Sequence, residues 1–416
     1  MLVFLLPNTS YRASDFLAAA ARAGADVLVA SDRCHKLDEV YAWPEGSIVV
    51  DYRDPAAAAA AVVDTVRARG LRPAAVVPLE GETPAMVAAM VSAALGLPAN
   101  AVDAARAARD KHRMRTLLAA AGVPVPAFRR VPLAAPPPAD LAYPVVLKPT
   151  FLSASRGVIR ADGPAEYARA RERIAAFLAR PAIRAVDPES ADHLLVEAFV
   201  PGPEVAVEGI LTHGSLRVLA LFDKPDPLDG PFFEETLYVT PSRLPAATQE
   251  AIARTTHDAV GALGLTHGPI HAELRVSPSG PVVLEVAARS IGGLCARVLR
   301  FGTGLSLEDV IVAHALGRDV ASPREARAAG VMMLPIPAPG VLREVSGVDA
   351  ARAVPGVEDV VISIPVDKEL EPLPEGGSYL GFIFAGGATP ADVEASLRSA
   401  HRRLHFTITP TLPMNE

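Results

Sequence analysis

The chain has 416 residues, half of them hydrophobic and 21% charged, with a formal net charge of −7. This length is enough for two or three domains with sizeable cores, and the composition is that of an ordinary globular protein. The acidic charge balance argues against nucleic-acid binding, and solvated helix faces explain the dispersed arginines best.

Cysteine usage and the N-terminus narrow the class of protein further. Cys34 and Cys295 are too few and too far apart for a disulfide framework or a Cys-rich zinc site, which favours a cytoplasmic protein. Residues 2–6 are apolar but too short for a signal peptide and have no basic segment before them, so they predict a buried strand. The alanine-rich run 56–63 is flanked by charges, which predicts a helix of a globular domain and no membrane span.

The first hundred residues alternate short apolar runs with helical patterns. Strands are predicted over 2–6, 27–30 and 74–78, and helices over 13–23, 56–69 and 83–95. This alternation indicates a parallel sheet with helices on both faces. A Gly-x-Gly-x-x-Gly fingerprint is missing, so the pattern gives only weak support for dinucleotide binding.

A different pattern begins near Asp103. Helices are predicted over 110–122, 164–178 and 308–316, strands over 144–148, 157–160 and 193–199, and a proline-rich loop over 132–138. Antiparallel strands with segregated helices indicate an α+β unit. The last ninety residues predict a smaller β-rich domain.

A lysine and a small-residue loop indicate a phosphate site. Lys148 ends a buried strand, where its charge needs a compensating anion, although a strand-end lysine alone is more often structural. The loop that follows directly can aim backbone N–H groups at phosphate oxygens. It consists of Ser153, Ala154, Ser155, Arg156 and Gly157.

Two carboxylates further along indicate a metal site. The apolar runs around Glu273 and Glu285 are joined by the turn 277–280, which predicts an antiparallel pair that brings both carboxylates together. Oxygen ligands on a rigid sheet suit Mg²⁺ bound to nucleotide phosphates. Arg289 can stabilise charge on a transferring phosphoryl group. His271 is expected beside Glu273 in a structural role.

In order along the chain stand Lys111, Lys148, the loop 153–157, the segment Glu197-Ala-Phe-Val-Pro-Gly-Pro-Glu204, Glu273, and Glu285-x-x-x-Arg289-x-x-Gly-Gly. In this ordered set the chain resembles the ATP-grasp superfamily over roughly residues 1–400, and it is most similar to the carboxylate–amine ligases that join L-amino acids into dipeptides. The resemblance implies an ATP-grasp fold of mixed α/β and α+β class. It implies a parallel α/β pre-ATP-grasp domain over 1–104, a two-lobed ATP-grasp domain over 105–320 with a lid at about 125–196, and a small β-rich C-terminal domain over 321–416.

The resemblance also implies a role for each motif. The phosphates would be bound by Lys111, Lys148 and the loop Ser153, Ala154, Ser155, Arg156 and Gly157. The adenine hinge would be Glu197, Ala198, Phe199 and Val200, with Glu204 on the ribose. The metal ligands would be Glu273 and Glu285, and the catalytic cations Arg289 and Lys148. Substrate contacts are expected from Lys224, Glu235, Arg289, Gly292 and Gly293, of which Lys224 is equally explained as a loop lysine and the glycine pair as a plain turn.

The implied activity is ATP-dependent formation of an amide bond between a carboxylic or amino acid and an amino acid. It would proceed through an acyl-phosphate and release ADP and phosphate. The expected cofactors are ATP and Mg²⁺, for which Mn²⁺ can substitute. Ala287 stands where many relatives carry Asn, so binding of a second metal ion stays open. The expected partners are small molecules, with a homodimer as one open oligomeric state.

Two alternatives to this activity stay open. One is another ATP-grasp ligase, biotin carboxylase-like or purine-pathway-like; the missing Met-Lys-Met segment disfavours the biotin carboxylase. The other is a catalytically silent ATP-binding regulator. Retention of Lys148, Glu273, Glu285 and Arg289 argues against a regulator, which could lose any of them.

Overall fold

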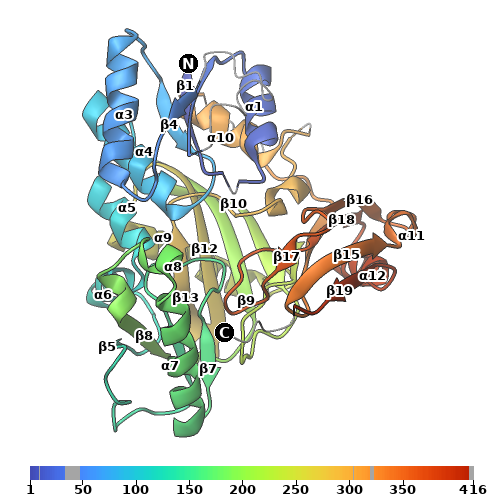
Figure 1. Cartoon of the computed structure of the whole chain (residues 1–416). Helices are drawn as coiled ribbons and strands as arrows, with labels where there is room; N and C mark the ends of the chain where they lie inside the picture. The colour runs from blue at the N-terminus through green and yellow to red at the C-terminus, as the bar shows by residue number, and fades with distance from the viewer. Residues whose placement is uncertain (9, 33–46, 303, 319–322, 412–416) are drawn as a thin grey trace.

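The structure, a computed structural model, describes residues 1–416 apart from 9, 33–46, 303, 319–322 and 412–416. Cys34 and the predicted domain boundary between residues 320 and 321 therefore lie outside the described residues. Among the described residues, no helix is both long and apolar enough to cross a membrane. Figure 1 shows the N-terminal part above a large central sheet, the lid at the lower left and the C-terminal part at the right.

The N-terminal part is the predicted parallel α/β unit. Its sheet has the order β3-β2-β1-β4, built from β1 (Leu2–Leu6), β2 (Val27–Ser31), β3 (Ser47–Val49) and β4 (Ala75–Pro78). Its helices are α1 (Ala13–Arg22), α3 (Pro55–Ala68) and α4 (Glu82–Leu95). All of β1 is buried because helices cover both faces: Phe4 packs on Phe16 of α1, and Leu5 shares a second core with Val62 of α3.

The lid is a four-stranded antiparallel sheet preceded by two helices. The sheet has the order β5-β8-β6-β7, built from β5 (Phe128–Pro132), β6 (Val145–Lys148), β7 (Ile159–Ala161) and β8 (His193–Ala198). The two helices before the sheet are α5 (Val102–Arg109) and α6 (Lys111–Ala120). Between β7 and β8 lie α7 (Pro164–Leu178), α8 (Pro181–Arg184) and the 3₁₀ turn η2 (Ser190–Asp192). The start of α6 is fixed by Asp110, whose side chain accepts hydrogen bonds from two backbone N–H groups.

The central sheet has eight strands in the order β13-β12-β9-β10-β11-β14-β18-β16. Their bounds are β9 (Glu204–Thr212), β10 (Ser215–Lys224), β11 (Leu237–Thr240), β12 (Gly268–Ser277), β13 (Gly280–Ala287), β14 (Ala328–Leu334), β16 (Val357–Ile362) and β18 (Gly381–Gly387), with helices α9 (Ala246–Ala262), η3 (Cys295–Val298) and α10 (Leu307–Ala315). The predicted hairpin of β12 and β13 is confirmed, and it sets Glu273 opposite Glu285. Alternate residues of β9 enter different cores, so both faces of the sheet are covered.

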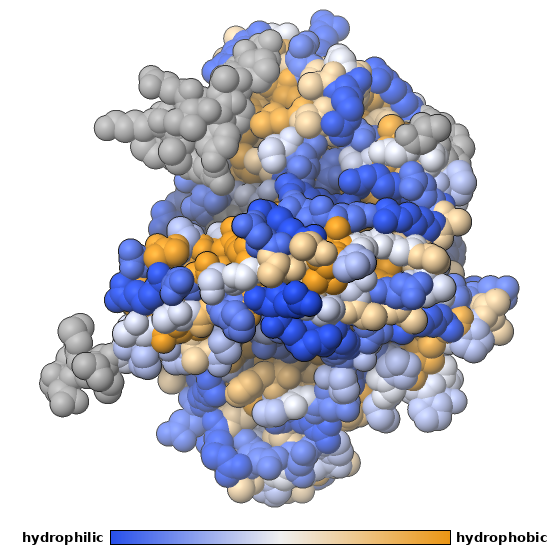
Figure 2. Space-filling model, turned by 90° about the vertical axis from the view of Figure 1, so that its right-hand side faces the viewer, coloured by the Kyte–Doolittle hydropathy of each residue, from blue (hydrophilic) through white to orange (hydrophobic). Residues whose placement is uncertain are grey.

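The C-terminal part continues the central sheet. Strands β14, β18 and β16 extend it beyond β11, and Val239 of β11 shares a core with Val393 of α12 (Pro390–His401). A small second sheet has the order β17-β15-β19, with β15 (Gly340–Ser346), β17 (Glu369–Leu370) and β19 (His405–Thr409); α11 (Val348–Arg352) completes the unit. Figure 2 looks onto this side of the molecule, where hydrophilic and hydrophobic residues are interspersed. The strands of the C-terminal part confirm its predicted β-rich character. The continuation of the central sheet into this part was not predicted.

Candidate active site

A cavity of about 810 Å³ opens where the lid, the central sheet, the N-terminal part and the C-terminal part meet. Of the predicted site residues, Gly157 and Lys224 alone are not in its lining, and each adjoins residues that are. Segments widely separated in the sequence thus converge on one space.

Lys148 reaches the cavity from the end of β6, paired with a buried carboxylate. Its Nζ lies 2.6 Å from Glu197 Oε2, and the other oxygen of Glu197 lies 2.6 Å from Nε of the fully buried Arg115. Burial lowers the pKa of Lys148. Burial alone would raise the pKa of Glu197, but the charges of Arg115 and Lys148 outweigh it and lower that pKa. The Glu197 side chain thus serves to hold Lys148, and the neighbouring residues 198–200 border the cavity.

Lys111, the first residue of α6, contacts the residue before the loop and one of the two predicted metal ligands. Its Nζ donates a hydrogen bond to the Leu152 carbonyl at 2.8 Å and lies 3.1 Å from Glu285 Oε2. The Lys111 ammonium therefore lies between the predicted phosphate loop and the predicted metal ligand Glu285, where it would contact a bound polyphosphate.

The small-residue loop has an unusual backbone. Ala154 and Ser155 have φ values of 55° and 53°, and Gly157 has 71°. This left-handed region is costly for residues with a Cβ, so the surroundings must hold the loop in place. At Gly157 a Cβ would also come within 2.8 Å of the Pro149 ring. Such turns form concave sets of backbone N–H groups that suit anions.

The predicted hinge and ribose residues are joined by Arg275 of β12. Its Nε lies 2.9 Å from Glu204 Oε2, its Nη1 donates to the Val200 carbonyl at 2.9 Å, and its guanidinium lies 4.9 Å from the centre of the Phe199 ring. Arg275 was not predicted from the sequence as a site residue. The available signal was its spacing of two residues from Glu273, which puts both side chains on one face of β12.

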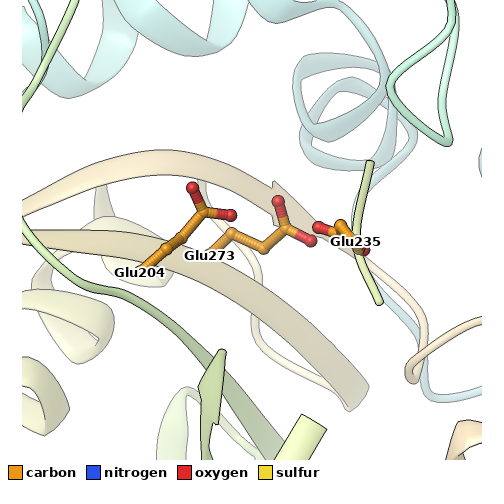
Figure 3. Close-up of side chains that lie close together, drawn as sticks. All are labelled: Glu204, Glu235 and Glu273. Atoms are coloured by element: carbon orange, nitrogen blue, oxygen red, sulfur yellow. The ribbon is translucent and has the colours of Figure 1, made fainter. Parts of the chain in front are cut away.

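Lys224 lies at the centre of three carboxylates. Its Nζ is 2.8 Å from Glu204 and 3.2 Å from Glu273, and it also pairs with Glu235. In Figure 3, Glu204 and Glu273 extend from neighbouring strands toward Glu235 on a separate segment. Burial opposes the charge of Lys224, but the carboxylates raise its pKa well above its ordinary value. Burial and the nearby Glu273 raise the pKa of Glu235 to about 7.

The oxygen donors present fit a divalent metal ion. Oxygen atoms of Glu204, Glu235 and Glu273 all lie within 4.8 Å of one another, but the Lys224 ammonium already pairs with all three. Glu273 and Glu285 are opposite one another on adjacent strands. Carboxylates in such an arrangement are the hard ligands that Mg²⁺ prefers. Ala287 is buried and offers no side-chain ligand. The set that includes Glu204 and Glu235 was not predicted from the sequence.

Arg289 lies in the cavity wall together with two carboxylates from the N-terminal part. Arg289 Nη2 lies 2.5 Å from Glu82 Oε1, and the Gly293 N–H donates to Glu80 Oε1 at 2.7 Å. Burial alone would raise the pKa of Glu82, but Arg289 and Lys111 lower it to about 2. Glu80 and Glu82 were missed, although they directly follow β4 at the carboxyl edge of a parallel sheet, where ligands commonly bind. Gly292 lies beside them in the cavity wall.

His271 contacts Glu273, one of the two predicted metal ligands. Its Nε2 lies 3.3 Å from Glu273, and its Nδ1 pairs with Glu208, whose other oxygen accepts from the Ile291 N–H at 3.1 Å. His267, by contrast, packs against His314 with ring centres 4.6 Å apart and ring planes tilted by 39°, and it does not line the cavity. His271 therefore positions Glu273, which is consistent with the structural role expected for it.

The charge of His271 gives the stability a defined pH dependence. Burial alone would lower its pKa, but Glu208 and Glu273 raise it to about 9. A raised folded-state pKa contributes stability that is fully present below about 6.5 and is lost as pH rises through about 9. We expect the free energy of unfolding to fall over that range, by on the order of 3 kcal/mol from this group.

Denaturant unfolding at pH 6 and pH 9 measures this slope. The slope should flatten in His271→Gln, and His257→Gln, on α9, is the control. An equally steep slope in His271→Gln would show that another group is responsible.

Two parts of the chain match known protein families. The family model for the ATP-grasp domain matches residues 141–298. A second family model, L-amino acid ligase C-terminal domain 2, matches residues 332–409. The chain thus combines an ATP-grasp domain with an L-amino acid ligase C-terminal domain.

Individual proteins agree with these domain matches. The crystal structure of an L-amino acid ligase from Bacillus licheniformis superposes with a TM-score of 0.84 at 27% sequence identity, covering 98% of both chains. The uncharacterized protein y4rH of Sinorhizobium fredii is 29% identical over 308 residues, 72% of this chain and 61% of that protein. Alanine–anticapsin ligase of Bacillus subtilis is 29% identical over 213 residues, 48% of this chain and 44% of that protein. The chain spans less than two thirds of the length of these two relatives.

Proposed function

We propose that this chain is an ATP-dependent ligase that joins the carboxyl group of one amino acid or related acid to the amino group of an amino acid. The observation that carries the proposal is the convergence of two lysines, Lys111 and Lys148, the loop 153–157 and the Glu273–Glu285 pair on one cavity. Arg289 and its acidic partners lie in the same cavity. The L-amino acid ligase C-terminal domain and the likeness to the Bacillus licheniformis enzyme support an amino acid as substrate.

The nucleotide is proposed to lie along the lid side of the cavity. Residues 198–200 would border the adenine and Glu204 would reach the ribose. Lys111, Lys148 and the loop 153–157 would bind the phosphates. Mg²⁺, held by Glu273 and Glu285, would neutralise phosphate charge when bound.

The chemistry needs an activated carboxyl group because carboxylates do not react with amines. The substrate carboxylate attacks the γ-phosphate of ATP, which gives an acyl-phosphate and ADP. The free amino group of the second substrate then attacks the acyl carbon, forms the amide bond and expels phosphate. Lys148 and Arg289 position the reacting groups and stabilise negative charge, and the lid excludes water from the acyl-phosphate.

The cavity end beyond Arg289 indicates the kind of side chain accepted. Part of its wall is apolar and aromatic, with ring centres of Phe382 lying 6.3 Å from Tyr379 and 5.8 Å from Tyr11, and Glu80, which accepts from the Tyr11 N–H at 3.3 Å, borders that part. Met333 and Ile336 complete this wall. We infer that one substrate is an amino acid with an apolar side chain, because a charged side chain would lose its hydration there.

A phosphate-release screen over pairs of amino acids, with mass spectrometry of the products, tests the proposal. We expect ADP and phosphate to form only when both substrates are present, with leucine, methionine or phenylalanine at least about tenfold better in one position than aspartate or lysine. ATP binding without turnover across the screen would favour the regulator instead. Transfer to bicarbonate or a purine precursor would favour the other ATP-grasp ligases.

A further inference from the structure

A short segment of the C-terminal part touches the phosphate loop directly. We call residues 371–377 the clasp; they connect β17 to β18 and belong to the region matched by the L-amino acid ligase C-terminal domain. The loop 153–157 and the clasp are more than 200 residues apart in sequence. Neither the lid sheet nor the central sheet joins them.

The clasp accepts hydrogen bonds from the loop through its backbone. The Gly157 N–H donates to the Pro374 carbonyl at 2.6 Å, and Arg156 Nε donates to the Glu375 carbonyl at 2.9 Å. Of the two donors, Gly157 has a left-handed backbone, and Arg156 directly follows the left-handed residues Ala154 and Ser155. The clasp therefore contacts the loop next to Ala154 and Ser155, the two residues for which a left-handed backbone is costly.

Two ion pairs fasten the clasp to α7 and to the residues just after it. Glu375 holds Arg173 through both oxygens, at 2.6 and 2.8 Å, and Arg180 lies 2.5 Å from Glu371. The Glu375 side chain is 14% exposed, whereas Arg180 and Glu371 are each nearly half exposed. Because exposed pairs contribute little, Glu375 is the stronger of the two attachments.

The clasp reaches the loop because two of its residues are glycines. A Cβ on Gly376 would lie 1.7 Å from the Glu371 carbonyl oxygen, and a Cβ on Gly377 would lie 2.8 Å from the Arg156 side chain. Any side chain at Gly376 would force the clasp to change its backbone. The close approach of the clasp to the loop therefore depends on these two glycines.

We propose that the clasp holds the phosphate loop in its binding conformation and that Glu375 is a positioning residue for that loop. The left-handed residues Ala154 and Ser155 have an energetic cost, and the hydrogen bonds that Arg156 and Gly157 donate to the clasp carbonyls offset it. The clasp leads directly into Ser378 and Tyr379, which line the substrate end of the cavity. One continuous segment therefore contacts both the phosphate loop and the substrate end, which makes closure of the loop depend on the C-terminal part.

Hydrogen exchange on the nucleotide-free protein tests the clasp without relying on turnover. In Gly376→Ala we expect the Gly157 amide to exchange at least about tenfold faster, because its acceptor moves away. Glu375→Ala should have a smaller effect in the same direction. The charge-swapped pair Arg173→Glu with Glu375→Arg should return exchange toward the wild-type rate.

Gly347→Ala is the matched control. A Cβ at Gly347 would lie 1.8 Å from the Arg403 carbonyl oxygen, so this variant strains the C-terminal part about as much but away from the clasp. Asp192→Ala removes an exposed ion pair of the lid that does not touch the clasp. Both controls should leave exchange at Gly157 unchanged.

Kinetics provide the second readout, which rests on the proposed function. We expect Gly376→Ala to raise the KM for ATP about tenfold and to lower the amide formed per ADP released, because a loosened loop admits water. Unchanged exchange at Gly157 in Gly376→Ala and Glu375→Ala, with faster exchange inside 371–377, would overturn the clasp. Changed exchange in a protein that forms no amide would keep the clasp and overturn the ligase.

Discussion

Glu285→Gln is expected to lower turnover by about 10²-fold or more while leaving the fold intact. The amide has nearly the same shape as the carboxylate but lacks the charge that a metal ion and Lys111 would contact. The 3.1 Å ion pair of Glu285 with Lys111 is largely buried, at 21% and 8% exposed, so its loss should also lower stability, by about 1–3 kcal/mol. The measurement is ADP formation with the best substrate pair, together with circular dichroism and the unfolding midpoint.

Glu250→Gln is the control, since Glu250 is an exposed residue of α9 remote from the cavity. Wild-type rates in Glu285→Gln would show that Glu285 is not a metal ligand. Arg289→Ala is a less clean variant, because it leaves Glu82, a buried carboxylate, without its partner. We expect it to lose both turnover and stability.

Lys224→Met is expected to lower the free energy of unfolding by about 3–5 kcal/mol at pH 8, as removing one partner from a buried ionic group does. Its ammonium is 2% exposed and faces the carboxylates of Glu204, Glu235 and Glu273. Without it, these groups repel one another and their folded-state pKa values rise. The loss should therefore shrink as pH falls toward 5, where the carboxylates take up protons.

Denaturant unfolding of wild type and variant at pH 8 and pH 5 measures both parts of this expectation. Arg254→Met, which removes a 69% exposed cation, is the control and should have a small effect at either pH. A loss that is the same at both pH values would mean that packing of the Lys224 stem, and not its charge, stabilises the fold.

Periodic and punctuated segments were predictable from the sequence. The parallel strands of the N-terminal part, α7 and the β12–β13 hairpin follow from apolar alternation, capping residues and turn residues, which are local signals. The strands β10 and β11 and the helix α9 were not predicted. Their identity depends on burial against partners distant in sequence, which local propensity does not reveal.

The predicted site residues share one cavity, but their partners were invisible in the sequence. Arg115 and Arg275 read as ordinary helix and strand charges, yet each is buried against a glutamate from another element. Glu80 and Glu82 belong to a part of the chain that the motifs did not include. Spacing along β12 and position after β4 could have placed Arg275, Glu80 and Glu82 near the site, but the partner of each one is set by tertiary contacts that spacing does not reveal.

The continuous central sheet has a consequence for how the chain is made. Strand β11 (Leu237–Thr240) pairs on its outer side with β14 (Ala328–Leu334), and β14 pairs on its outer side with β18 (Gly381–Gly387). During synthesis the edge of β11 stays unpaired for nearly ninety residues, with Leu237 and Val239 uncovered until the last helix arrives. Unpaired edges are where nascent chains associate wrongly. The C-terminal part therefore completes the pairing of the central sheet, and a chain that stops at residue 318 would leave the edge of β11 unpaired and prone to association.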